Sequence, residues 1–412
     1  MQLVNTPVRE LHNDAGGSIL PDLGLRKSEF WPFYEDDEID AAVEVLRSGK
    51  VNQWTGDAVS RFQDACARRF GGNEGIALAN GSVALELPLK VFGIGAGDEV
   101  VVTPRSFVAS ASAVRLVGAT PVFADVDVAS GNISAETIAP AITPRTKAII
   151  PVHLAGWPCD MPAIMELARA HGLQVIEDCA QAHGAEIDGL SVGSFGDAAA
   201  FSFCQDKIIS TAGEGGFVSF KSASDWARAW SYKDHGKSWT KVNSAHSENS
   251  FRWLHDTVGT NWRLTGPQAA IGLRQLDKLD IWRDLRTYNA SIWREALKDV
   301  PGLHVPMPAG RFRHAFYKLY AYLDVENPET KRNEILRRSA EAGLRVFSGA
   351  CPEVYLEQAF ADLPRPNLPN ARLLGQTSLM VEVHPTLDSQ LLRRRAAALA
   401  QIARDVLDEG AG

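Results

Sequence analysis

The chain has 412 residues, which is long enough for a large core and two domains. Hydrophobic residues make up 45% and charged residues 22%, the composition of an ordinary soluble globular protein. The formal net charge of -8 argues against nucleic-acid binding, which favours a basic face. A phosphorylated substrate is still possible, because a local basic pocket can lie on an acidic protein.

Neither a disulfide framework nor a metal site is predicted. The five cysteines are scattered and contain no CxxC pair (Cys66, Cys159, Cys179, Cys204 and Cys351), which is typical of reduced thiols in a cytoplasm. The first residues do not show a charged segment followed by an apolar one, and no run approaches the ~20 apolar residues of a membrane helix. We therefore expect a soluble, cytoplasmic protein that binds neither nucleic acid nor membrane.

The N-terminal part begins irregularly and then becomes helical. Residues 1–30 carry no periodicity and are interpreted as an arm. A helix is predicted over 36–47, with Ile39, Val43 and Leu46 on one face. A second helix is predicted over 57–70 and ends at two glycines.

From residue 75 onward, short apolar runs alternate with helical patterns. Strands are predicted at 75–79, 99–102, 121–124, 147–152, 174–177, 198–203 and 217–220, and the helices among and after them at 80–91, 107–116, 135–142, 161–171 and 223–232. Strands and helices in alternation form βαβ units. We therefore expect an α/β fold with a mostly parallel sheet of the seven-stranded type, covered by helices on both faces.

From residue 233 onward, the regular alternation of strands and helices stops. Residues 233–258 are polar, aromatic and irregular, and a loop of that length is usually functional or an intersubunit contact. A long helix is predicted from 265 towards 298. A strand at 317–322 and helices at 330–342 and 389–407 follow. These patterns predict a large α/β domain over 31–290 and a small α+β domain over 291–412.

Polar or aromatic residues follow several predicted strands. Ser82, after Asn80 and Gly81, opens a helix whose N-terminus could hold a phosphate, although Ser82 could also be a simple N-cap. Phe107 is either core or a ring stacked on a flat cofactor. Asp178 ends an apolar strand, and a carboxylate there needs a positive partner, either a protonated ring nitrogen or an arginine.

Lys207 follows the strand that carries Ser202, just beyond its carboxyl end, where α/β proteins place their ligands. An isolated lysine is usually a solvated surface residue. In a partly desolvated pocket, however, a lysine amine becomes nucleophilic towards carbonyls. Gln181 and His183 add polar groups near Asp178, and a histidine there is more often structural than catalytic. A lysine for an aldehyde, an acid for a pyridinium nitrogen and a helix N-terminus for a phosphate match pyridoxal phosphate (PLP).

At this point the chain resembles a known family, the DegT-type (DegT/StrS-like) sugar aminotransferases, which are fold-type I PLP-dependent enzymes. Six stretches carry the resemblance in the family's order: 80–82, 103–109, 152–156, 176–185, 201–216 and 259–263 with 268–270. The resemblance covers roughly residues 30–410. An ordered match of six parts is far more specific than one motif.

The resemblance implies a role for each matching residue. Lys207 would form the Schiff base and later move the proton between substrate carbon and cofactor. Asp178 would pair with the pyridinium nitrogen. The remaining cofactor contacts would be Gln181 near the ring hydroxyl, Phe107 on the ring, and Gly81, Ser82 and Ser202 at the phosphate. In a homodimer, Asn261, with Arg263 as a second candidate, would reach the phosphate of the neighbouring subunit.

The resemblance also implies a reaction. We expect the amination of a keto-sugar, most often nucleotide-linked, with glutamate as donor and PLP alternating with its pyridoxamine form, in surface-polysaccharide or natural-product biosynthesis. A cyclitol or another keto-intermediate of antibiotic biosynthesis is the alternative acceptor. A dehydratase subgroup has histidine where Lys207 stands, and a non-catalytic binding protein would not need Lys207 and Asp178 together. The lysines Lys233 and Lys237 could gather near the site with Arg263, but simple solvated lysines are the preferred interpretation.

Overall fold

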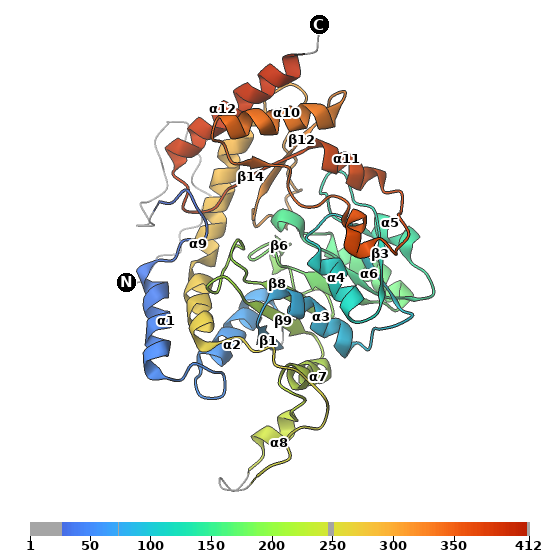
Figure 1. The fold of residues 1–412 in the computed structure, drawn as a ribbon, viewed down its shortest axis with the longest axis vertical. Coiled ribbons are helices and arrows are strands. Elements are labelled where there is room, and N and C mark those ends of the chain that lie inside the picture. Colours follow the sequence, from blue (N-terminus) through green and yellow to red (C-terminus); the bar gives the residue numbers. More distant parts are fainter. Residues whose placement is uncertain (1–26, 73, 246–250, 410–412) are drawn as a thin grey trace.

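The computed structural model describes residues 27–72, 74–245 and 251–409 (Figure 1). The predicted arm over 1–30 therefore lies outside the described residues up to position 26. The described chain forms a large sheet flanked by helices and a smaller region built mainly from residues after 290.

The large sheet contains all seven predicted strands. They are β1 (Glu74–Leu78), β2 (Glu99–Val102), β3 (Thr120–Phe123), β4 (Thr146–Ile150), β5 (Gln174–Asp178), β8 (Ala198–Ser202) and β9 (Gly216–Phe220). Their order is β1-β9-β8-β5-β4-β2-β3. Only β9 runs antiparallel to its neighbours, β1 and β8, so the expected mostly parallel sheet is confirmed.

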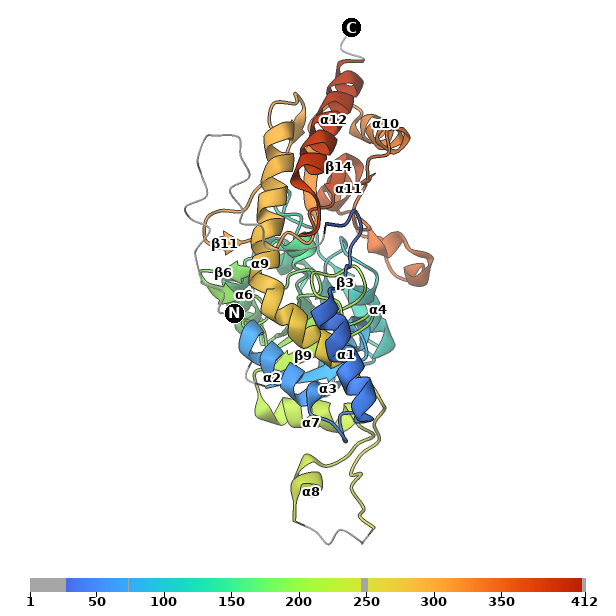
Figure 2. The same ribbon diagram turned by 90° about the vertical axis from the view of Figure 1, so that its left-hand side faces the viewer.

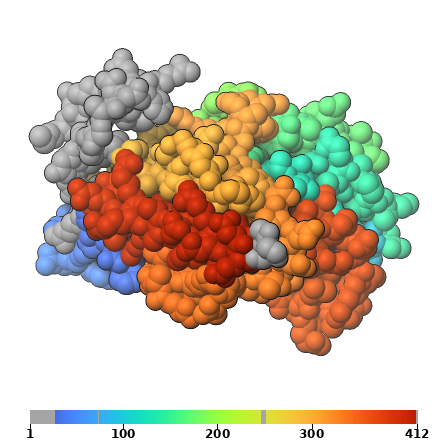
Figure 3. Space-filling view, turned by 90° about the horizontal axis from the view of Figure 1, so that it is seen from above, coloured from blue at the N-terminus to red at the C-terminus, as the bar shows by residue number. Residues whose placement is uncertain are grey.

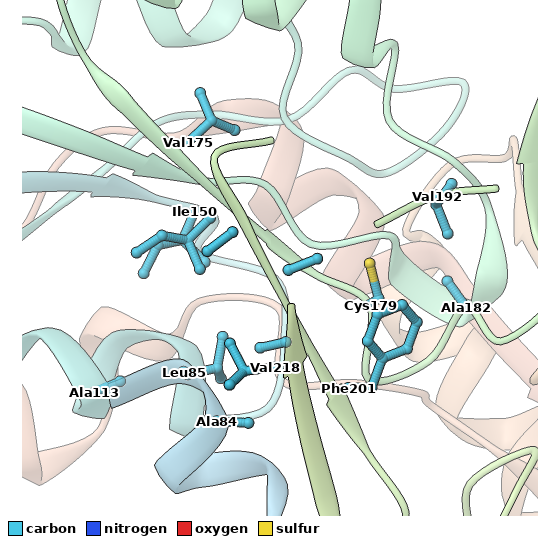
Figure 4. Close-up of a cluster of buried hydrophobic side chains, with 14 of the residues drawn as sticks. Ala84, Leu85, Ala113, Ile150, Val175, Cys179, Ala182, Val192, Phe201 and Val218 are labelled. Atoms are coloured by element: carbon cyan, nitrogen blue, oxygen red, sulfur yellow. The ribbon is translucent and has the colours of Figure 1, made fainter. Parts of the chain in front are cut away.

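The central strands are buried along their whole length. β2, β8 and β9 have no exposed residue, which is why their sequences are continuous apolar runs instead of alternating ones. Leu85 of helix α3 packs towards Val218 of β9, while Val175 of β5 lies farther along the same core (Figure 4). This core fixes the carboxyl ends of the strands, where the polar residues lie.

Helices surround the sheet. Those of the large region are α1 (Asp36–Ser48), α2 (Ala58–Phe70), α3 (Gly81–Val91), α4 (Ala109–Leu116), α5 (Ala135–Ile138), α6 (Met161–His171), α7 (Ala223–Lys233) and α8 (Trp239–Asn243). Helices α3, α4 and α7 pack together beside the sheet, and α2 packs between β1 and α9. A short three-stranded sheet, with the order β11-β6-β7, joins β6 (Glu186–Ile187) and β7 (Leu190–Ser191) to β11 (Phe312–Arg313).

The long helix α9 (Gly266–Leu297) connects the two regions, running from the large sheet to the smaller one (Figure 2). The second sheet has the order β10-β12-β14-β13, formed by β10 (Leu303–His304), β12 (Leu319–Leu323), β13 (Val346–Phe347) and β14 (Ser378–Val381). The helices of this region are α10 (Pro328–Glu341), α11 (Pro369–Thr377) and α12 (Ser389–Asp408). Helix α12 lies along α9 (Figure 3) and closes a second hydrophobic core that draws on residues from 290 to 406.

The predicted apolar face of α1 points the other way. Ile39 is 49% exposed and Leu46 is 58% exposed, whereas Glu38 and Ala41 are the buried residues. Glu38 can be buried because its carboxylate accepts from the Glu35 N–H and lies 3.4 Å from the Lys278 ammonium of α9. The pattern of apolar residues therefore identified the helix but gave the wrong buried face.

The irregular stretch after α7 forms an extension that projects away from the sheet and carries α8 (Figure 1). Bridges between Asp234 and Asn261 and between Lys237 and His255 close its base. Phe251, 79% exposed, contributes to an apolar surface on this extension. Among the described helices, none is long and apolar enough to span a membrane.

Candidate active site

A phosphate cradle lies where β1 meets α3. Asn80 is the N-cap of α3, and its side chain accepts the Val83 N–H at 3.1 Å, so the alternative of Ser82 as N-cap is wrong. Ser82 is exposed in the first turn, where backbone N–H groups point out of the helix. A Cβ on Gly81 would lie only 2.5 Å from the Ser202 Cβ and 2.8 Å from its Oγ. Glycine is thus needed to bring this helix N-terminus against the Ser202 hydroxyl, a geometry suited to a phosphate.

Asp178 is a buried carboxylate without a cation. Its side chain is 3% exposed, and it accepts hydrogen bonds from the Ser110 hydroxyl at 2.8 Å and the Ala180 N–H at 3.1 Å. Within the described part of the chain it makes no ion pair. Burial raises the pKa of Asp178 in spite of these two hydrogen bonds. A positively charged group beside it would stabilise the carboxylate, as the protonated nitrogen of a pyridine ring does.

Gln181 and Phe107 frame the space near Asp178 in different ways. The Gln181 Oε1 accepts the Ala155 N–H at 2.7 Å, which leaves its amide N–H groups to meet a ligand. Phe107 is 67% exposed and follows β2 directly before α4. A phenyl ring as exposed as this is not part of the core, and its position fits a ring that stacks on a ligand.

Lys207 lies in a small polar group that joins the two regions. Its side chain is 15% exposed, and its Nζ lies 3.4 Å from the Asp206 Oδ1 and 3.5 Å from the Tyr317 hydroxyl. Tyr317 in turn donates a short hydrogen bond to the other Asp206 oxygen. The Lys207 backbone carbonyl accepts from the Trp31 indole at 2.7 Å. The lysine is therefore held by groups from before α1, from the loop after β8 and from just before β12.

His183 lies among aromatic rings. It is fully buried against Phe70, Phe201 and Phe203, and neither ring nitrogen has a side-chain partner in the described structure. Burial lowers the pKa of His183 to about 3, so the ring is neutral at ordinary pH. The structural interpretation of this histidine is the one that the contacts support.

The residue before Asp178 anchors the strand end. The Glu177 carboxylate accepts the His153 Nε2–H at 3.1 Å and three backbone N–H groups, those of residues 193, 195 and 196. The His153 Nδ1 accepts the Cys159 N–H, which fixes the proton on Nε2. Burial opposes ionisation, but these hydrogen bonds hold the pKa of Glu177 below its ordinary range. Although His153, Glu177 and Cys179 lie close enough to share a metal ion, the glutamate oxygens are already occupied.

Asn261 and Arg263 lie apart from this group, at the base of the extension. Asn261 is exposed, and Arg263 donates to Asp234 at 2.8 Å. The fully buried Asp234 also receives the Lys237 ammonium at 3.1 Å. Lys233 is fully buried as well and lies 3.7 Å from Asp234, so the expectation of a solvated lysine is wrong at that position. Three cations gather here around one carboxylate.

The pieces in one subunit fit PLP. Gly81, Ser82 and Ser202 would hold its phosphate, Asp178 its ring nitrogen, and Lys207 its aldehyde carbon. The unpaired buried acid and the cradle that a Cβ would fill are the two features that favour this group. Two contributors escape a sequence search: Ser110, whose hydroxyl lies within a helix, and Tyr317, which is 110 residues from Lys207.

Comparisons with known proteins agree with this geometry. The model of the DegT/DnrJ/EryC1/StrS aminotransferase family matches residues 32–399. The chain is 37% identical over 331 residues to the UDP-N-acetyl-3-dehydro-alpha-D-glucosamine 3-aminotransferase of Acidithiobacillus ferrooxidans, covering 79% of this chain and 83% of that protein. It is 34% identical over 343 residues to the 3-amino-5-hydroxybenzoate synthase of Amycolatopsis mediterranei, covering 82% and 84%.

The fold is shared as well. The solved structure of an aminotransferase from Psychrobacter cryohalolentis matches with a TM-score of 0.89 and 46% sequence identity, covering 92% of this chain and 99% of that one. Members of the family use PLP, and this chain has kept the lysine, the acid and the phosphate cradle that the cofactor needs. The chain therefore belongs to the DegT/DnrJ/EryC1/StrS aminotransferase family and is a PLP-dependent aminotransferase.

Proposed function

We propose that this enzyme transfers the amino group of glutamate to the ketone of a nucleotide-linked sugar and so makes an amino-sugar for a surface polysaccharide or a natural product. The observation that carries the proposal is the buried Asp178 carboxylate, which makes no ion pair among the described residues, together with the Lys207 amine, in a chain 37% identical to an aminotransferase of a UDP-linked sugar. We place the reaction in the cytoplasm, where the unpaired cysteines would stay reduced.

PLP supplies the carbonyl that takes up the amino group and a ring that delocalises negative charge from the substrate carbon. The Asp178 carboxylate keeps a proton on the ring nitrogen, because a buried anion favours a cation beside it. The N-terminus of α3 and the Ser202 hydroxyl orient the ligand through its phosphate. Lys207 holds the cofactor between turnovers and moves the proton at the reacting carbon. The exposed Phe107 ring would stack on the cofactor ring.

We further propose that the active enzyme is a homodimer, with Asn261 and Arg263 contributing to the neighbouring site. The exposed apolar residues on the outer face of α1, Ile39 and Leu46, support a second copy there, because isolated domains seldom expose such a row. The exposed Trp253 of the extension is a second apolar residue that a neighbouring copy could cover. Arg263 binds Asp234 within its own subunit, so in this proposal its contact to a neighbour would be made by the remaining guanidinium N–H groups.

The division of the chain into a large domain over 31–290 and a small one over 291–412 is part of the same proposal. The second hydrophobic core supports it, because its buried residues all come from position 290 onward, whereas the first core also includes residues between 315 and 374. The site then lies between domains, because Lys207 belongs to the first and Tyr317 to the second.

The acceptor would be chosen by residues around the opening of the site. Cys351 pairs by its backbone with Ser106, which places segment 347–352 directly beside Phe107. The extension formed by residues 233–258 is the second candidate. Similarity to a 3-amino-5-hydroxybenzoate synthase favours one alternative, an acceptor ketone that is a cyclitol or another biosynthetic intermediate instead of a nucleotide sugar.

Absorbance tests the proposal. Purified protein reconstituted with PLP should be yellow, lose the colour when glutamate is added alone, and recover it when a UDP- or GDP-linked 3-keto or 4-keto sugar follows. Recovery only with cyclitol ketones would select the alternative. Failure of glutamate and other amino acids to remove the colour would refute transamination. Sedimentation of the same protein should show a dimer. Asn261→Ala should weaken PLP binding, and the variant should still sediment as a dimer.

A further inference from the structure

The loop before Lys207 contains a carboxylate that does not serve the predicted cofactor contacts. Asp206 is half-exposed, and its two oxygens are divided between Lys207 and Tyr317. Its oxygens face the amine that carries the chemistry.

Tyr317 is fixed in place on all sides. Its side chain is 8% exposed, its N–H donates to the Ala155 carbonyl at 2.9 Å, and its own carbonyl lies 3.4 Å from an Arg286 nitrogen. Ala155 is in turn bound by Gln181. The backbone of Tyr317 is therefore joined by a short chain of hydrogen bonds to Gln181, the residue expected at the cofactor ring.

The directions of the hydrogen bonds follow from the charges. Burial, and then the nearby Asp206 carboxylate, raise the pKa of Tyr317 well above its ordinary value, so the phenol keeps its proton. Burial opposes ionisation of Asp206, but attraction to the Lys207 ammonium holds the pKa of Asp206 below its ordinary value. Tyr317 thus donates to Asp206, and its oxygen and the other carboxylate oxygen are left to accept from Lys207.

We infer that Asp206 and Tyr317 form a clamp that holds the Lys207 amine whenever it is not bonded to the cofactor. Both are positioning residues: they return the amine to one place, from which it can move the proton at the substrate carbon. The inference rests on the proposed role of Lys207, but it concerns residues that act through the lysine.

A second lysine offers a matched control. Lys318 lies 5.3 Å from the centre of the Tyr317 ring, and Lys207 lies 4.9 Å from it. The Lys318 ammonium is 3.4 Å from the Glu382 carboxylate, the same separation as that of Lys207 from Asp206. Glu382→Gln therefore removes an equivalent charge next to the same ring without touching the clamp.

The test is acetylation of the cofactor-free, full-length protein with limiting acetic anhydride, followed lysine by lysine by peptide mass spectrometry. The clamp restrains the Lys207 amine by two contacts, so removing either partner should leave the amine freer to react and accelerate labelling. Asp206→Asn should label Lys207 about two- to fivefold faster, the effect of a partly exposed ion pair. Tyr317→Phe should act in the same direction, and Glu382→Gln should accelerate Lys318 but not Lys207.

Equal Lys207 labelling in wild type, Asp206→Asn and Tyr317→Phe would overturn the inference. In the loaded enzyme, Asp206→Asn should lower kcat of the glutamate half-reaction and leave KM for glutamate unchanged. A change in KM alone would assign Asp206 to donor binding and would also overturn the clamp. A wild-type protein that fails to react with glutamate would refute the proposed function and leave the labelling result standing.

Discussion

Asp178→Asn removes one negative charge from the centre of the site and keeps the shape of the side chain. The asparagine oxygen can still accept from the Ala180 N–H, and its amide can donate to the Ser110 hydroxyl, which turns to accept. The variant should therefore fold. We expect it to stabilise the cofactor-free protein and to weaken the binding of PLP.

In the cofactor-free protein the change should be stabilising. Burial raises the pKa of Asp178 above its ordinary value of 3.8, so the folded state binds its proton more tightly than the unfolded state does. The favourable contribution is full below pH 3.8 and is lost as pH rises through the folded pKa. At pH 7 the ionised carboxylate is thus a cost, which asparagine removes.

With PLP bound, the same change should be harmful. A hydrogen bond to a charged partner contributes about 1.5–3 kcal/mol, and losing it should weaken cofactor binding about 10- to 150-fold. Titration of absorbance with PLP measures the affinity, and urea unfolding at pH 7 with and without PLP measures stability. If Asp178→Asn destabilised the cofactor-free protein and left PLP affinity unchanged, Asp178 would be a structural residue and the assignment to the ring nitrogen would be wrong.

Three further changes test separate features. Gly81→Ala should lower the free energy of unfolding by about 1–3 kcal/mol and weaken PLP binding, because its Cβ would lie 2.5 Å from the Ser202 Cβ. Gly95→Ala is the control and should do neither, because the nearest atom to its Cβ would be 3.5 Å away. Burial depresses the pKa of His183 from 6.5 to about 3. The free energy of unfolding should therefore fall by about 1.4 kcal/mol per pH unit as pH drops below 6.5. Urea unfolding of His183→Leu between pH 7 and 4.5 should lack this part of the pH dependence. Burial lowers the pKa of Lys233 from 10.5 to about 8, so its contribution to the free energy of unfolding is full above pH 10.5 and is lost as pH falls to about 8. The wild type should therefore be more stable at pH 10 than at pH 8 by this contribution, and urea unfolding of Lys233→Met should lack that part of the difference.

The sequence was sufficient to predict the strands of the main sheet. Seven apolar runs predicted seven strands, because a strand buried on both faces must be apolar throughout. Asp178 and Lys207 stood out because a charge at the end of such a strand is costly unless it is used. Strands of two residues, such as β13, carry too few side chains for a pattern and were missed.

Long-range partners could not be predicted. Tyr317 reaches Asp206 only because α9 carries the chain back over the site, and no local pattern encodes that contact. The buried Lys233 looked solvated because its partners, Asp234 and Gln53, reveal their role only after folding. The buried face of α1 was misjudged for a related reason: Lys278, from a distant helix, neutralises Glu38 and permits its burial.

The central claim is that PLP is bonded to Lys207, and one measurement addresses it directly. Protein reconstituted with PLP is reduced with borohydride, digested and analysed by mass spectrometry for the peptide that carries the reduced cofactor. The account predicts the modification on Lys207 in the wild type and its absence in Lys207→Ala. Cofactor attached to another lysine, or to none in a protein that is nevertheless yellow, would contradict it.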